Sequence, residues 1–108
     1  MAATSQKRAN YRIEYPRSLR PTLTIDHVAH EVINLSEKGI KFARTDHYQP
    51  QVKDPILGTL TFANRESLAI VGRVLRLSGQ FCVAVMRQGV PLPIILEQQR
   101  ILLRKTAK

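Results

Sequence analysis

The segment Ile56–Met86, ILGTLTFANRESLAIVGRVLRLSGQFCVAVM, decides the fold class. Residues 56–63 alternate between two faces in the way of a strand with one buried side. The polar segment 64–66 and the Ser78-Gly79 pair are typical of turns, so the apolar runs that follow each of them are predicted strands. These two runs are Leu68–Leu77 and Phe81–Met86. Strands joined by such short turns pair antiparallel.

The upstream half of the chain repeats this pattern. From Leu19 to Asp26 every second residue is apolar, which predicts a half-buried strand. A second strand is expected over Ala29–Leu35, and after a turn at Gly39 a third includes Ile40 and Phe42. Tight connections favour a closed barrel over an open sheet, because closure removes unpaired strand edges. We therefore expect a six-stranded antiparallel β-barrel.

The C-terminal segment changes period. After Pro91 and Pro93, apolar positions recur near the 3.6-residue spacing of a helix. Ile94/Ile95 and Ile101/Leu102 are the apolar positions, and Gln98 lies between them at the same spacing. A helix over about residues 91–104 is predicted, with its apolar stripe closing one mouth of the barrel. The fold class is all-β with a C-terminal helix.

Composition limits the function. At 108 residues and 44% hydrophobic content, the chain is expected to form one domain. Its net charge of +9 favours an anionic partner, whether nucleotide, nucleic acid or acidic protein. The single cysteine, Cys82, excludes a disulfide framework and fits a reducing cytoplasm. No apolar run approaches the roughly 20 residues that span a bilayer, so we expect a soluble, cytoplasmic protein without membrane insertion.

Two arginines lie in the polar N-terminal segment 1–16, which we interpret as a flexible basic arm ahead of a barrel domain over 17–108. Arg8 and Arg12 are four residues apart, roughly 13 Å when extended. A guanidinium can hold a phosphate or the O6/N7 edge of guanine through two parallel hydrogen bonds. The alternative is a solvated basic tail.

Asn34, Ser36 and Gly39 form a second pattern at the turn between the second and third strands. Period two places Asn34 and Ser36 on one face of the strand, pointing outward from the core. They supply neutral donors and acceptors suited to a purine or a phosphate, and Gly39 allows a close turn beside them. Ordinary hairpin chemistry explains the same residues. Taken with the two arginines, they indicate a guanine-nucleotide site without a P-loop.

The Arg8-x-x-x-Arg12 arm followed by Asn34-x-Ser36-x-x-Gly39 resembles the PilZ domain, a bacterial receptor for cyclic di-GMP. The resemblance implies that both arginines wrap over the ligand and that Asn34, Ser36 and Gly39 line the barrel side. We expect no catalytic residue, no bound metal and no cofactor.

The resemblance extends over nearly the whole chain, including Gly72-Arg73-Val74 and the helix segment 98–100. The sequence departs from the family pattern at Ala9 and Asn10, where many members have further arginines, and in the sixth strand, which lacks a glycine. The implied mechanism is that ligand orders the arm onto the barrel and creates a surface for an unidentified downstream protein. Monomer and homodimer both remain open.

Three other functions are weighed against this one. A PilZ-like adaptor would act by protein contacts alone, without nucleotide. A barrel that binds RNA or single-stranded DNA needs aromatic side chains along a strand face, whereas Phe42, Phe62 and Phe81 take apparent core positions. An enzyme is not expected because no paired carboxylates or triad can be assembled. A metal site is disfavoured because His27 and His30, three apart in a strand, point to opposite faces.

Overall fold

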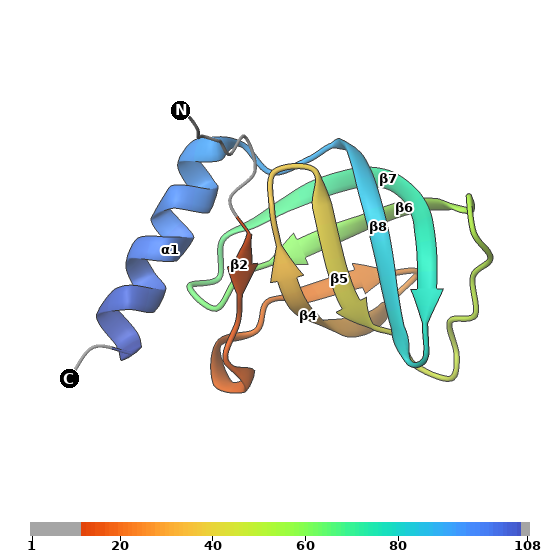
Figure 1. Ribbon diagram of the computed structural model, residues 1–108, viewed down its shortest axis with the longest axis horizontal. Coiled ribbons are helices and arrows are strands. Elements are labelled where there is room, and N and C mark those ends of the chain that lie inside the picture. Colours follow the sequence, from red (N-terminus) through yellow and green to blue (C-terminus); the bar gives the residue numbers. More distant parts are fainter. Residues whose placement is uncertain (1–11, 107–108) are drawn as a thin grey trace, which may run out of the picture.

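The computed structural model describes residues 12–106, with side chains over 12–104. The described residues form seven strands, one short 3-10 turn and one helix (Figure 1). In chain order they are β2 (Ile13–Glu14), η1 (Arg17–Leu19), β3 (Thr22–Ile25), β4 (Val28–Leu35), β5 (Gly39–Ala43), β6 (Pro55–Thr61), β7 (Ser67–Ser78), β8 (Phe81–Gln88) and α1 (Leu92–Thr106).

Six of the strands close into an antiparallel barrel, as predicted. The sheet runs β4-β3-β6-β7-β8-β5, and a further β4–β5 pairing joins its two ends. Asp26 and His27 connect β3 to β4 with φ angles of 51° and 69°, typical of the type I′ turn that suits a two-residue hairpin. Closure leaves the barrel interior to apolar side chains such as Leu23, Phe42 and Leu60, each 0% exposed.

The first long strand is shorter than its alternation suggested. Residues 17–19 form the 3-10 turn η1, and β3 begins only at Thr22. Pro21, Leu23 and Ile25 still point inward as expected. The period-two pattern therefore predicted the buried face correctly while extending the strand too far.

An irregularity in β4 sets the direction of the residues that follow it. Val32 pairs with Phe42, but Asn34 pairs with Lys41, so β4 carries one extra residue relative to β5. His30 and Val32 point inward before the bulge, and Leu35 does so after it. The bulge thus turns Asn34 toward the outside of the barrel.

β2 lies where the sequence predicted a flexible arm. Ile13 and Tyr15 are only 3% and 6% exposed and belong to the core, so the part of residues 1–16 nearest the barrel is built into it. β2 pairs with β4 through Ile13↔Leu35 and Glu14↔Asn34. It is too short to show a periodic signal, so hydrophobic periodicity does not predict it. Residues 1–11 lie outside the described part of the chain.

α1 lies across one end of the barrel beside β2 (Figure 1). Ile95 is fully buried, and Gln98 is 5% exposed and accepts a 3.0 Å hydrogen bond from the Tyr15 hydroxyl. The predicted helix at one mouth of the barrel is therefore present, and it packs against β2 and, through Ile95, against the core. Within residues 12–106, no helix has the length and apolar character that crossing a membrane requires.

Candidate ligand-binding site

The turn between β4 and β5 is held by its own residues. The Ser36 amide donates to the Gly39 carbonyl at 2.8 Å, and the Gly39 amide donates to Ser36 Oγ at 3.0 Å. A Cβ on Gly39 would lie 3.2 Å from Ser36 Oγ, so the glycine allows this close approach. Ser36 and Gly39 thus already perform the hairpin role that the sequence left as an alternative to ligand binding.

A second layer fixes this turn against the end of β8. The Val90 amide donates to the Glu37 carbonyl at 3.0 Å, and the Met86 amide donates to the Lys38 carbonyl at 2.7 Å. Gly89 packs so closely that a Cβ there would lie 1.9 Å from the Glu37 carbonyl oxygen. The turn is therefore a rigid platform, as a preorganised binding surface requires.

Asn34 faces out of the barrel, as predicted, but β2 covers most of it. The side chains of Asn34 and Ser36 belong to residues only 9% and 7% exposed. Asn34 Nδ2 donates a 3.4 Å hydrogen bond to Glu14 Oε2, its partner on β2. A ligand on the outer surface can reach only the edge of each group.

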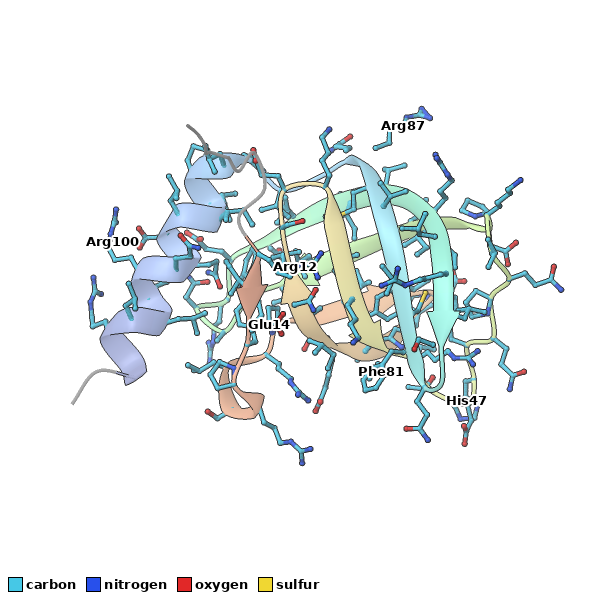
Figure 2. The ribbon with its side chains drawn as sticks, viewed as in Figure 1. Arg12, Glu14, His47, Phe81, Arg87 and Arg100 are labelled. Carbon is cyan, nitrogen blue, oxygen red and sulfur yellow. The ribbon has the colours of Figure 1, made fainter. Side chains whose placement is uncertain are left out.

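Arg12 is exposed and lies immediately before β2, next to Ile13. Figure 2 shows Arg12 and Glu14 near each other, between α1 and the β4–β5 hairpin. A groove of about 340 Å³ separates β2 from α1 here, lined by Arg12, Ile13, Glu14, Gln99, Leu102 and Leu103. Arg8, the other predicted arginine, lies outside the described residues. The structure therefore brings one motif arginine to the Asn34–Gly39 turn.

The outer face of β5, β8 and β7 continues from this turn and is free of acidic residues, since none of the three strands contains Asp or Glu. Asn34 pairs with Lys41, and Lys41 in turn pairs with Val83. Beyond them, Arg76 on β7 pairs with Val83. Sequence reasoning missed Lys41 and Arg76, although the position of Lys41 two residues after Gly39 in a strand places both on one face.

Phe81 belongs to the same outer face, so its predicted core position is wrong. It is half-buried, and Lys41 Nζ lies 4.9 Å from the centroid of its ring. Phe42 and Phe62 are buried as expected, at 0% and 3% exposure. One aromatic ring on the face is far from the row of stacking residues that single-stranded nucleic acid uses.

Comparison with known proteins identifies the family. A family model described as the PilZ domain matches residues 6–104. The chain belongs to the PilZ domain family.

A search of solved structures found "Structure of Bacillus subtilis Inhibitor of motility (MotI/DgrA)", with a TM-score of 0.66 and 13% sequence identity. That match covers 96% of this chain and 54% of the other, so this PilZ domain spans about half of that protein. At this identity the likeness supports the fold alone. A search of curated proteins found no match.

The candidate metal-binding and nucleophilic side chains of this PilZ domain are its histidines and Cys82. His27 is exposed in a turn, whereas His30 is 2% exposed and packs against the rings of Phe42 and Tyr48, with centroids 5.3 and 5.1 Å away. Burial lowers the pKa of His30. Cys82 is a buried core residue, and burial raises its thiol pKa to about 11. Within residues 12–106, no cluster of three His, Cys, Asp or Glu side chains is placed to hold a metal.

Proposed function

We propose that this PilZ domain is a receptor for cyclic di-GMP, which binds through Arg8, Arg12, Asn34, Ser36 and Gly39. One observation carries the proposal: β2 pairs with β4, so that Arg12 stands next to the Asn34–Gly39 turn although 22 positions separate the two in sequence. Membership of the family supports the ligand. The pairing supports a joint role for the arm arginine and the strand turn.

The chemistry of the ligand matches the charge of this surface. Cyclic di-GMP carries two phosphodiesters and two guanines, and a guanidinium recognises either group with paired hydrogen bonds. Arg8 lies within roughly 13 Å of Arg12 along an extended chain, so the two can grip separate parts of one dinucleotide. Lys41 and Arg76 add positive charge on the adjoining outer face of β5 and β7.

The proposed signal is ordering of the arm. Ligand phosphates and guanines order the arm that carries Arg8 onto the barrel face, and the covered ligand and arm form a new surface for a downstream protein. The built-in strand β2 restricts this change to the residues that precede it. Ligand then acts as the bridge between the Asn34–Gly39 turn and the arm.

A specific observation favours the adaptor as a second candidate. Ser36 Oγ is already engaged with the Gly39 amide, and the Asn34 amide with Glu14. Both residues are more than nine-tenths buried. The turn pattern can therefore be retained for structural reasons in a domain that recognises only proteins.

Isothermal titration calorimetry with cyclic di-GMP, in moderate salt to screen non-specific charge binding, tests the proposal. GTP and cyclic GMP are the ligand controls. The wild-type protein should bind selectively at micromolar concentration or tighter, and Arg12→Ala should lose about tenfold or more, the worth of a charged hydrogen bond. Arg17→Ala, an exposed arginine on η1, is the matched control and should bind like the wild type. Absence of heat from the wild type would favour the adaptor.

A further inference from the structure

Glu14 makes a contact that neither sequence motif contains. It is the β2 partner of Asn34, and its Oε2 accepts the hydrogen bond from Asn34 Nδ2 at 3.4 Å. An ionised carboxylate can only accept hydrogen bonds, whereas a side-chain amide has a donating end and an accepting end. Glu14 therefore discriminates between the two orientations of the Asn34 amide.

The orientation matters because Asn34 has little freedom. Its residue is 9% exposed, and its cross-strand neighbours are Glu14 on β2 and Lys41 on β5. With Nδ2 directed to Glu14, the carbonyl oxygen Oδ1 is the end left for a ligand. Within residues 12–104 no group donates a hydrogen bond to this oxygen. Asn34 then offers only an acceptor, as an aspartate at this position would.

We propose that Glu14 is a positioning residue that fixes the Asn34 amide with Oδ1 toward the ligand, so that Asn34 reads the N1–H and N2 amino donors of a guanine. The inference rests on the proposed function and names the ligand group that Asn34 contacts. Phosphate oxygens are acceptors and cannot bond to Oδ1. Adenine has an acceptor at N1 and no N2 amino group, so the arrangement also selects guanine over adenine, because unpaired buried polar groups reject the wrong base.

A competing, purely electrostatic role for Glu14 predicts the opposite effect of its removal on ligand affinity. A carboxylate near the ligand phosphates repels them, so a purely electrostatic Glu14 would weaken binding and its removal would strengthen it. The positioning role requires that removal weakens binding. Arg12, two residues earlier, lines the same groove and brings a positive charge to it in either case.

The test is a double-mutant cycle measured by calorimetry with cyclic di-GMP and cyclic di-AMP. Glu14→Gln should weaken cyclic di-GMP binding about 3- to 10-fold, within the range for one hydrogen bond, and reduce the preference over cyclic di-AMP. Asn34→Asp presents acceptors in either orientation, so adding Glu14→Gln to it should leave affinity unchanged or raise it. Glu31→Gln, which removes an exposed charge from β4 away from Asn34, should leave the preference unchanged.

Two results of this cycle would overturn the proposal. One is tighter binding of cyclic di-GMP by Glu14→Gln alone, and the other is an equal loss of affinity when Glu14→Gln is introduced into the wild type and into Asn34→Asp. The contact between Glu14 and Asn34 can also be measured in the ligand-free protein, so it can be tested separately from the binding of cyclic di-GMP. The side-chain amide signals of Asn34 in a ¹⁵N-labelled sample should shift and lose exchange protection in Glu14→Gln but not in Glu31→Gln. Unchanged signals would refute the contact whether or not the wild type binds cyclic di-GMP.

Discussion

The hydrogen bond between Tyr15 and Gln98 gives the sharpest stability prediction. The Tyr15 hydroxyl donates to Gln98 Oε1 at 3.0 Å, and the two residues are 6% and 5% exposed. Tyr15→Phe removes the donor and leaves a buried amide oxygen without its partner. The change keeps the ring, so packing against the core is retained and the polar contribution is isolated.

The magnitude follows from the burial of both groups. Leaving a buried acceptor unsatisfied costs about 1–3 kcal/mol. For a domain of about 100 residues each kcal/mol shifts the melting temperature by about 5 °C. Tyr15→Phe should therefore lower Tm by about 5–15 °C. The loss falls on the junction between β2 and α1, because the bond joins those two elements.

Tyr48 provides a matched control within the same chain. Its hydroxyl is also buried but has no hydrogen-bond partner among residues 12–104. Tyr48→Phe removes an unpaired polar group while keeping the ring against His30, so stability should stay the same or rise. Both variants are compared by thermal and urea unfolding at pH 7. Equal effects of the two substitutions, or a Tyr15→Phe protein as stable as the wild type, would refute the reasoning.

Three further predictions concern pH and packing. Burial lowers the pKa of His30, so the unfolded state takes up its proton first and stability should fall as pH drops below about 6.5. Tm should decline between pH 7 and 5, and less steeply in His30→Phe; an equal decline in both proteins would count against it. Burial raises the pKa of Cys82 to about 11 and that of Tyr48 to about 12. The unfolded state therefore loses these protons first, and stability should fall above about pH 9. Cys82→Ala should flatten this decline, and a pH profile identical to that of the wild type would contradict the prediction. Gly89→Ala should lower the free energy of unfolding in urea by about 1–3 kcal/mol, because the added Cβ meets the Glu37 carbonyl. Gly79→Ala should cost less, because its Cβ meets open space and only the φ angle of 59° disfavours a side chain there.

The barrel could be predicted because its strands are long enough to show alternation and its turns carry recognisable residues. The bulge in β4 could not, since one extra residue leaves no mark in composition. The outer and inner faces of β8 were ambiguous because Phe81–Met86 is apolar throughout. The structure places Cys82, Ala84 and Met86 inside and the bulkier Phe81 outside, where Lys41 covers its ring. Alternation cannot choose between two apolar faces.

The candidate site was only partly predictable from the sequence. The motif residues Asn34, Ser36 and Gly39 are adjacent in sequence, so their shared turn could be expected. The contact between Glu14 and Asn34 depends on the register of a two-residue strand, which local sequence does not specify. A strand this short is stabilised by burial of its own residue Ile13 and of the next residue, Tyr15. The residues that distinguish this site from a plain hairpin are thus the ones that required the structure.

β2 contacts both the proposed ligand surface and the helix, which leads to a final prediction. Glu14 on its outer face touches Asn34, while Tyr15, the next residue, bonds to Gln98 of α1. If β2 must be docked for ligand to bind, apparent affinity scales with the docked fraction. Tyr15→Phe should then weaken cyclic di-GMP binding, although Tyr15 lies in the core.

The size of that effect measures how firmly β2 is held. A loss of about 1–3 kcal/mol at the Tyr15–Gln98 bond lowers the docked fraction only where the local opening free energy is of similar size, as at chain ends that fray. Weaker binding together with a lower Tm would therefore identify β2 as a marginal element that couples ligand to α1. A lower Tm with unchanged affinity would refute that coupling, because it would show that β2 stays docked after its bond to the helix is lost.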